Sequence, residues 1–372
     1  MKLICFYLPQ FHETEENNRW WGQGYTDWTA LKDSKKYFKT HRRPRIPLDH
    51  NYYDLSLEDG ATIRWQAELA KQHGIYGFCI YHYWFGGKQL LYKPVDVLRA
   101  HKEIDIHYTL CWDSNTWKRT WYADQHAQEV LMEQQYGDEK IWTKHFMDLL
   151  PDFMDERYIK IDNKPVFHIY RAYQIPCLLE MRQCWDKLAM ENGFAGIYLI
   201  AGDVENRNEE RLVDAIDAFY NYEPVHAFHN SIKRWYGIIT ISRTGIIKRL
   251  NRIFHCDFFP DKRSAKGIYR EIIKLQEEEK KKTYKGIFVD YDDTPRRQKT
   301  GAVYTGNNVH LFKRCLEKQI EQSNQDGRQD DFLYINAWNE WGESAYLEPD
   351  EENKYLYLDT IKDVLSHVKD TK

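Results

Sequence analysis

The sequence predicts an α/β protein built as a (β/α)8 barrel, and three observations favour this fold. The chain has 372 residues, within the range of roughly 200 to 400 residues that such barrels usually occupy. Short runs rich in β-branched and aromatic residues recur eight times along it. Amphipathic helical patterns lie between these runs, as expected for a chain in which strands and helices alternate.

Start and stop signals of the helices separate the predicted strands. Residues 58–73 predict a helix that stops at Gly74, a common C-terminal cap. Residues 176–192 predict another, which begins at Pro176 and ends before Gly193. The eight predicted strands lie near residues 2–8, 75–82, 106–112, 165–170, 196–201, 215–220, 286–291 and 332–338.

A doubly wound open sheet is the alternative α/β fold. Such sheets usually carry a glycine-rich phosphate loop directly after the first strand. Here the first strand runs into Leu8-Pro9-Gln10-Phe11-His12, which contains no glycine. We therefore favour the barrel.

Two long segments interrupt the alternation, at about residues 9–57 and 223–285. Each follows a predicted strand, and loops that follow strands lie on the C-terminal face of a barrel, where active sites are built. The first segment holds clustered aromatic residues and the basic stretch 41–45. Because no repeat or linker divides the chain, residues 1–372 are predicted to form a single catalytic barrel domain with these two insertions.

The composition is that of a folded globular chain, with 42% hydrophobic and 30% charged residues. A net charge of −4 and a pI of about 6.4 provide no positive field, so we expect no nucleic-acid partner. Aromatic residues make up 15% of the chain. Tyrosine and tryptophan combine an apolar face with a polar group, so we expect many of them to line a cleft for sugars. Enrichment within a large core is the alternative.

The cysteines suggest a reducing compartment. Seven of them are scattered along the chain with no C-x-x-C pair, which argues against a disulfide framework or a zinc site. The N-terminus becomes polar too soon for a signal peptide, and no run approaches the roughly 18 apolar residues of a membrane span. We therefore predict a cytoplasmic protein with no metal and no other cofactor.

The strongest motif lies at the end of the eighth predicted strand, over residues 334–343. Because side chains alternate along a strand, Asn336, Trp338 and Glu340 would share the face that points to the barrel axis. Ile335 would then pack against helices, as would Ala337.

A sharp turn at Gly342 would bring Glu343 back toward Glu340. Two carboxylates among tryptophans can divide acid and base chemistry, because repulsion and burial raise one pKa while hydrogen bonds keep the other group ionised. Cleavage of glycosidic bonds needs this division. The alternative is a pair of solvated loop charges.

Aromatic residues also follow the second and third strands. In the run from Tyr81 to Gly87, one face would pack and the other would offer His82 to the site, unless His82 is a hydrogen-bonded core residue. After the third strand, Trp112 and Trp117 are candidate stacking platforms. For either tryptophan, a place in the core is the alternative.

Asp290 and Asp292 follow the same spacing on the seventh strand and would share one face. Such a pair can bind the metal of a nucleotide-sugar transferase, bind sugar hydroxyls, or form a structural network with arginines. The spacing alone is weak support for a metal. Within the second insertion, the basic and partly amphipathic stretch 232–254 suggests weak contact with an anionic membrane surface, or a solvated loop and helix.

Taken together, these segments resemble one family. The chain is similar to the WbsX-type glycosyltransferase proteins of polysaccharide gene clusters, which are described as glycoside hydrolase family 99-like. The resemblance covers nearly the whole chain. It includes the ordered, tryptophan-rich segments Phe6-Tyr7-Leu8-Pro9-Gln10-Phe11-His12, Trp20-Trp21-Gly22-Gln23-Gly24-Tyr25-Thr26-Asp27-Trp28, Tyr81-His82-Tyr83-Trp84-Phe85, Asp292-Asp293-Thr294-Pro295-Arg296-Arg297 and Asn336-Ala337-Trp338-Asn339-Glu340-Trp341-Gly342-Glu343.

The resemblance implies a (β/α)8 barrel that acts on glycosidic bonds. Family 99 enzymes are retaining, endo-acting α-mannosidases and α-mannanases that use neighbouring-group participation and two glutamates. At the matching positions, Glu340 would deprotonate the sugar 2-hydroxyl, which attacks C1 to give a 1,2-anhydro sugar. Glu343 would protonate the leaving oxygen and then activate water.

Two departures from the family pattern affect the expected specificity. Where related proteins carry W-A-N-E-N-W, this chain has Asn115 at the glutamate position, so a charged contact to a sugar is missing or is replaced by Asp113. Asp27 stands where glutamate is usual. These changes put mannose specificity in doubt more than the catalytic pair.

Three functions follow from these predictions. The first is a retaining, endo-acting hydrolase of α-linked polysaccharide, mannan-like or from a bacterial surface. The second is a glycosyltransferase of O-antigen or capsular polysaccharide biosynthesis, and the third is a glycan-binding protein. In addition to the catalytic pair Glu340 and Glu343, the expected substrate-binding residues are Trp21, Trp28, Tyr81, His82, Trp84, Trp112, Trp117, Asp290, Asp292, Asn336, Trp338 and Trp341.

Overall fold

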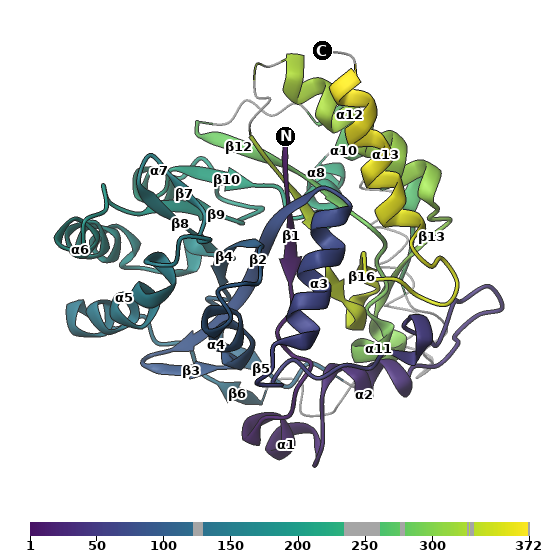
Figure 1. The fold of residues 1–372 in the computed structure, drawn as a ribbon, viewed down its shortest axis with the longest axis horizontal. Coiled ribbons are helices and arrows are strands. Elements are labelled where there is room, and N and C mark those ends of the chain that lie inside the picture. Colours follow the sequence, from purple (N-terminus) through teal and green to yellow (C-terminus); the bar gives the residue numbers. More distant parts are fainter. Residues whose placement is uncertain (122–128, 234–260, 276–279, 326, 328–330, 371–372) are drawn as a thin grey trace.

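The computed structural model describes residues 1–121, 129–233, 261–275, 280–325, 327 and 331–370. Among these residues, eight parallel strands form a closed barrel in which β1 pairs with both β2 and β14 (Figure 1). The predicted (β/α)8 fold is confirmed. In order around the barrel, the strands are β1 (Lys2–Tyr7), β2 (Ile75–Phe85), β4 (His107–Trp112), β8 (Lys164–Ile169), β9 (Tyr198–Ala201), β10 (Ala218–Tyr220), β12 (Lys282–Phe288) and β14 (Phe332–Asn336).

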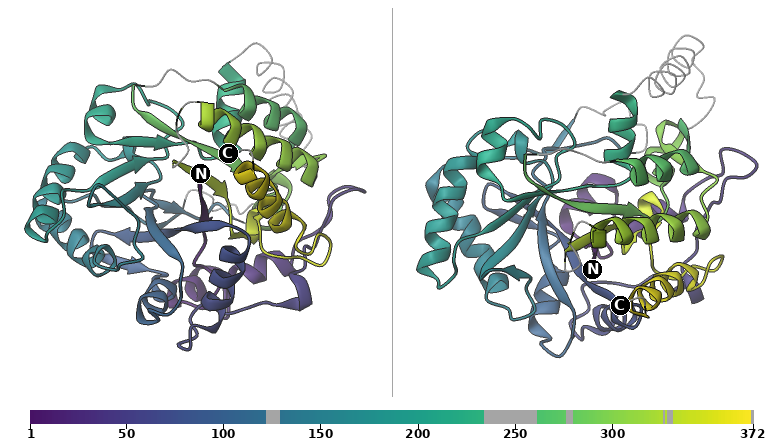
Figure 2. Two further views of the ribbon diagram at one scale, coloured as in Figure 1. Left: turned by 45° about the horizontal axis from the view of Figure 1, so that its top comes forward. Right: turned by 90° about the horizontal axis from the view of Figure 1, so that it is seen from above.

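Helices lie outside the strands around the barrel (Figure 2). Predicted helix 58–73 is α3 and predicted helix 176–192 is α6. After α3, Gly74 has a φ of 81°, and a Cβ there would lie 2.5 Å from Leu365 Cδ1, so glycine suits this position. The helices are α1 (Glu15–Trp21), α2 (Asp27–Lys32), α3 (Ala61–Gln72), α4 (Lys93–Ala100), α5 (Glu139–Phe153), α6 (Leu178–Glu191), α7 (Glu210–Ala215), α8 (Val225–Lys233), α10 (Ala265–Lys274), α11 (Thr294–Arg297), α12 (Val309–Gln325) and α13 (Leu356–Asp370).

Short strands and 3-10 helices lie in the loops at the ends of the barrel, and many of them belong to its C-terminal face. The short strands are β3 (Lys88–Leu90), β5 (Trp117–Lys118), β6 (Val130–Met132), β7 (Lys160–Ile161), β11 (Asp261–Ser264), β13 (Ala302–Thr305), β15 (Asn339–Glu340) and β16 (Ala345–Tyr346). The 3-10 helices are η1 (Leu48–His50), η2 (Ala172–Gln174), η3 (Gln298–Thr300) and η4 (Trp341–Glu343).

The barrel interior is itself aromatic. Phe6 lies at its centre, with ring centroids 5.2 Å from Tyr220 and 5.8 Å from Tyr334. These rings are buried with small residues such as Cys79 and Cys111. A second, larger apolar layer fills the space between the strands and the helices. Part of the aromatic content therefore fills the core instead of lining a cleft, which was the alternative explanation.

The seventh strand differs from its prediction. It was expected at residues 286–291 but forms over Lys282–Phe288. Three of its first four residues are polar (Lys282, Thr283 and Lys285), which hides this part from a search for apolar runs. Asp290 and Asp292 therefore follow the strand and do not share a strand face.

The two interrupting segments contain elements of their own. Residues 9–57 carry α1, α2 and η1, and residues 223–285 carry α8, β11 and α10. Residues 234–254 of the basic stretch 232–254 lie outside the described residues, so contact with a membrane surface stays a prediction. In the described part of the chain, no helix has the length and hydropathy needed to cross a bilayer.

Candidate active site

The predicted catalytic pair lies on a small ribbon and turn beyond β14. Glu340 lies on β15, which pairs with β16 through Ala345, and η4 then carries Glu343. The turn was expected to need glycine at position 342 for its shape. The structure adds a steric reason, because a Cβ on Gly342 would lie 2.5 Å from Arg296 Nε.

One guanidinium connects the two glutamates. Arg296 Nη2 lies 2.7 Å from Glu340 Oε1, and its Nη1 lies 3.5 Å from Glu343 Oε1. The same Nη2 also donates to Asp27 Oδ2. Arg296 lies on α11, which contacts both α2 and η4 at the C-terminal face (Figure 1). Three carboxylates from segments far apart in sequence thus share one cation, and the predicted pair is held close together.

The two glutamates have different surroundings. The Glu340 side chain is 7% exposed and that of Glu343 is 21% exposed, so Glu343 keeps access to solvent. Burial raises the pKa of Glu340 well above its ordinary value. The charge of Arg296 opposes this shift, while the charges of Glu343 and Asp27 add to it. Glu340 is therefore a carboxyl group with unusually high proton affinity beside a fixed cation.

Tyrosines from three barrel strands surround Glu343. Tyr170 follows β8, Tyr222 follows β10 and Tyr291 follows β12. Burial raises the pKa of each of these hydroxyls, and the nearby charge of Glu343 raises it further. The sequence analysis missed all three as site residues. Their shared signal is a tyrosine placed within three residues after the end of a barrel strand.

Tyr81 and Asn336, two of the expected substrate-binding residues, extend this tyrosine cluster. Tyr81 donates a hydrogen bond of 3.1 Å to the Tyr222 hydroxyl, which donates to Asn336 Oδ1 at 3.4 Å. Asn336 Nδ2 in turn donates to the carbonyl of Glu223 at 3.0 Å. The hydroxyls at the mouth of the barrel are thus fixed by a continuous chain of hydrogen bonds.

Two of the predicted tryptophans lie near the rim. Trp21 stacks on Trp121 with ring centroids 5.0 Å apart, and the guanidinium of Arg296 lies 4.9 Å from the Trp121 ring. Trp117 contacts Tyr83 edge-on at 4.9 Å. Trp121 was not predicted as a site residue.

The departure at position 115 is partly compensated. Asn115 Nδ2 donates to Asp113 Oδ1 at 2.5 Å, and Trp117 Nε1 donates to the other oxygen at 2.8 Å. Burial raises the pKa of Tyr83, and the charges of Asp113 and Glu340 raise it further. Asp113 therefore places a carboxyl group near Tyr83, in the region of Glu340.

The predicted residues of β2 lie on opposite faces of the strand. Tyr81 points to the mouth of the barrel, whereas His82 and Trp84 point outward into the layer under the helices. His82 is fully buried and stacks on His145 at 5.1 Å, and Trp84 stacks on the same ring at 4.0 Å. Trp112 also lies in this outer layer. The three residues belong to the core, the alternative that the sequence had left open.

The remaining predicted tryptophans pack around the turn that carries Glu340 and Glu343. Trp341 stacks on Tyr346 at 3.7 Å and donates to Glu348 Oε2 at 2.6 Å. Trp28 and Trp338 are buried in the same apolar layer. Regular strand structure ends at Asn336, so the alternation expected to turn Trp338 toward the axis does not continue. These rings fix the turn and do not form an open sugar platform.

Asp290 and Asp292 form the structural network with arginines. Asp290 Oδ2 lies 2.5 Å from Arg45 Nη2. Asp292 Oδ2 lies 2.7 Å from both His41 Nε2 and Arg43 Nη2. Burial disfavours ionisation of Asp292, but Arg43 and His41 outweigh it and hold its pKa below the usual range. Both carboxylates are buried and occupied, which corrects their prediction as substrate-binding residues and explains the basic stretch 41–45.

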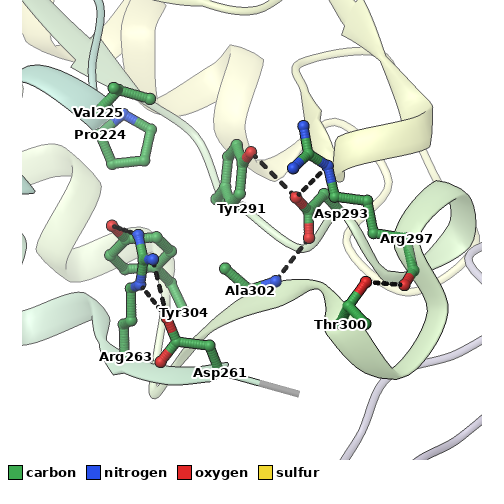
Figure 3. A pocket seen from close by; sticks show the side chains of 10 residues that line it. All are labelled: Pro224, Val225, Asp261, Arg263, Tyr291, Asp293, Arg297, Thr300, Ala302 and Tyr304. Carbon is green, nitrogen blue, oxygen red and sulfur yellow. Dashed lines mark hydrogen bonds and ion pairs between the residues drawn. The ribbon is translucent and has the colours of Figure 1, made fainter. Parts of the chain in front are cut away.

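Two pockets that share Val225 open beside the tyrosine cluster. One has a volume of about 240 Å³ and includes Tyr170 and Tyr222. The other has a volume of about 210 Å³ and includes Tyr291 (Figure 3). Because these three tyrosines surround Glu343, the pair lies next to space that can receive a ligand.

Comparisons with known proteins agree with this fold. The family model described as "Glycosyltransferase WbsX" matches residues 3–361. "Uncharacterized protein WxcX" from Xanthomonas campestris pv. campestris is 29% identical over 371 residues, covering 99% of this chain and 50% of that protein. The chain thus spans about half the length of the curated relatives it matches.

Solved structures share the architecture at low sequence identity. A GH99 endo-α-mannosidase from Bacteroides thetaiotaomicron superposes with a TM-score of 0.58 at 12% identity, covering 99% of this chain and 97% of that one. A "glycoside hydrolase-like protein" gives a TM-score of 0.58 at 14% identity, covering 98% and 93%.

Proposed function

Because the chain belongs to the WbsX glycosyltransferase family, a family of carbohydrate-active enzymes, we propose that it is a retaining, endo-acting glycoside hydrolase. The observation that carries the proposal is the contact of one guanidinium, that of Arg296, with both Glu340 and Glu343. The proposed substrate is an α-linked polysaccharide, either mannan-like or from a bacterial surface. The named activity of the superposed endo-α-mannosidase agrees with an α-linkage.

Glu340 is the proposed base. It takes the proton of the sugar 2-hydroxyl, and the oxygen then attacks C1 to form a 1,2-anhydro sugar. A carboxylate with a raised pKa is a stronger base, provided that it is ionised. Burial supplies the raised pKa of Glu340, and the contact with Arg296 stabilises its ionised form.

Glu343 is the proposed acid. It gives its proton to the leaving oxygen as the C1–O bond breaks, and it then takes a proton from water. The water oxygen attacks C1, the anhydro ring opens, and Glu340 returns its proton to the 2-oxygen. Glu343 suits this role because its side chain is the more exposed of the pair and can reach both the leaving group and water.

A test compares Glu340→Gln and Glu343→Gln with Glu191→Gln, a change at an exposed glutamate at the end of α6. The substrates are an α-linked mannan and a panel of bacterial surface polysaccharides. Each of the first two variants should lose cleavage while keeping its circular dichroism spectrum and melting temperature, and the product anomer followed by NMR should match the substrate. Full activity in either variant refutes the assignment.

A glycosyltransferase is the second candidate, and the family description favours it. The pair expected to bind its metal is engaged by arginines and His41, which weakens the case. Calorimetry with nucleotide sugars and Mn²⁺ separates the two functions. Saturable binding of a nucleotide sugar would favour the transferase, and its absence together with cleavage would favour the hydrolase.

A further inference from the structure

A pocket of about 210 Å³ lies between the β11–β13 ribbon and the loop after β12. We call it the ribbon pocket, and Figure 3 shows its lining residues. It adjoins the catalytic pair, because the backbone N–H of Asp292 donates to the Glu343 carbonyl at 2.7 Å. Tyr291 lines the pocket, and the charge of Glu343 adds to the rise in the pKa of its hydroxyl. Its lining consists of Pro224, Val225, Asp261, Arg263, Tyr291, Asp293, Arg297, Thr300, Ala302 and Tyr304.

One side of the ribbon pocket is an ordered aspartate–arginine pair. Asp261 Oδ2 accepts from Arg263 Nε at 3.0 Å and Nη2 at 2.8 Å, and Arg263 Nη1 donates to the Tyr304 hydroxyl at 3.2 Å. The guanidinium also lies 3.6 Å from the centre of the Phe228 ring on α8. A guanidinium held by bonds in its plane and by a ring on its face has little freedom left.

The opposite side repeats this arrangement. Asp293 Oδ2 lies 3.2 Å from Arg297 Nε and accepts a hydrogen bond of 3.5 Å from the Tyr291 hydroxyl. Its other oxygen accepts from the backbone N–H of Ala302 at 2.6 Å, which ties the ribbon to this side. Figure 3 shows the two pairs on opposite sides, with Tyr291 directed toward Asp293.

The charges of this lining balance. Asp261 and Asp293 face Arg263 and Arg297, so two negative and two positive groups line the pocket, which offers both hydrogen-bond acceptors and donors. Each sugar hydroxyl both donates and accepts, so a neutral sugar can use both kinds of group. Because Arg263 already pairs with Asp261 and Arg297 with Asp293, the carboxylate of an acidic sugar would give the pocket an excess of negative charge.

The volume limits the ligand to a small one. Pockets for drug-sized ligands measure roughly 300–1,000 Å³, and the ribbon pocket is smaller, at about 210 Å³. We propose that the ribbon pocket is a subsite for a single neutral sugar unit, on the leaving-group side of the bond that is cleaved. This side follows from the position of the pocket beside Glu343, the proposed acid, and to that extent the inference rests on the proposed function.

The test measures binding in the full chain with Glu343→Gln, which prevents turnover. The probes are methyl α-mannopyranoside and methyl α-glucopyranoside as neutral sugars, and methyl α-glucopyranosiduronate as the acidic one, titrated by saturation-transfer NMR. We expect the neutral glycosides to bind at least tenfold more tightly than the uronate. A preference for the uronate overturns the proposal.

Adding Asp261→Asn tests the pocket itself, because it removes one negative charge and leaves Arg263 without its carboxylate partner. The preference should then shift by at least tenfold toward the uronate, a change that loss of folding cannot produce. Asp217→Asn is the matched control, since Asp217 pairs with Arg182 at 2.9 Å at the start of β10, outside the site. An unchanged ratio in Asp261→Asn, with binding retained, refutes the ribbon pocket as the site. Tyr304→Phe removes only a hydroxyl, so it serves if Asp261→Asn does not fold, and it should weaken neutral binding.

Failure of this inference can be told apart from failure of the proposed hydrolase. If the expected shift occurs but Glu343→Gln still cleaves polysaccharide, the ribbon pocket binds sugar and the assignment of Glu343 is wrong. If Glu343→Gln abolishes cleavage but Asp261→Asn changes nothing, the catalytic pair stands and the sugar lies elsewhere.

Discussion

Replacing Arg296 by glutamine should move the acidic limb of the activity profile to higher pH. Glutamine keeps hydrogen-bonding groups at this position but removes the positive charge that contacts both Glu340 and Glu343. An opposite charge at such a distance lowers the pKa of a carboxyl group by about 1–3 units. The pKa of Glu340, already raised by burial, should therefore rise by about that amount in the variant.

The size of the effect follows from the ionised fraction of the base. A base acts above its pKa, and below the pKa its ionised fraction falls tenfold for each pH unit. A shift of about 1–3 units thus predicts a loss of about 10- to 1,000-fold in kcat/KM at a pH below both pKa values. At a pH above the shifted pKa the loss should become much smaller.

The assay is the pH dependence of kcat/KM, measured from initial rates of reducing-end release on the polysaccharide that the wild type cleaves. Arg64→Gln is a suitable control, because Arg64, on α3, forms an exposed ion pair with Glu103 in the loop after α4. Melting temperatures at each pH show whether the variant is folded. The reasoning is refuted if folded Arg296→Gln keeps the wild-type acidic limb, or if the limb moves to lower pH.

Three further predictions test the surroundings of the pair. Gly342→Ala should displace the Arg296 guanidinium, because its Cβ would lie 2.5 Å from Nε. Kinetic assays should then show kcat/KM lowered at least tenfold. The control Gly267→Ala should leave kcat/KM unchanged, because its Cβ would lie 3.4 Å from the nearest atom. Glu348 is buried with its pKa raised to about 7, so the folded state holds more protons than the unfolded state between about pH 4 and 7. The free energy of unfolding should therefore fall as pH rises through this window, and urea titrations should show a smaller fall in Glu348→Gln. Asp292→Asn should cost about 3–5 kcal/mol of unfolding free energy in the same titrations, because it leaves buried cations without their partner.

How much of the site could be predicted depended on sequence distance. Glu340 and Glu343 could be found because the motif that carries them is continuous and follows a clear strand. Arg296 could not be assigned, since its contact with Asp27 joins residues 269 positions apart. Only the closed barrel brings the first insertion, α11 and η4 together, and no local sequence pattern predicts this contact.

The prediction of which side chains on β2 point to the site was wrong for a different reason. Alternation divides a strand into two faces but does not say which face points inward, and in a barrel covered by helices both faces are apolar. Tyr81 and Trp84 are both aromatic, so their residue types do not separate the barrel interior from the helix layer. The bounds of β12 were wrong for another reason: its polar first half hid the start of the strand, so Asp290 was placed on a strand that had already ended.

Asp27 should shift the pKa of Glu340 in the opposite direction to Arg296. Its carboxylate shares Nη2 of Arg296 with Glu340, and its charge raises the pKa of Glu340. Asp27→Asn should therefore leave Arg296 more available to Glu340 and move the acidic limb to lower pH, by up to about one unit for the loss of one like charge. Loss of any buried contact would lower the overall rate in both variants, but it would not displace the limb in opposite directions. If Asp27→Asn and Arg296→Gln move the limb the same way, the group that titrates is not Glu340, and the assignment of this carboxyl group as the base must be abandoned.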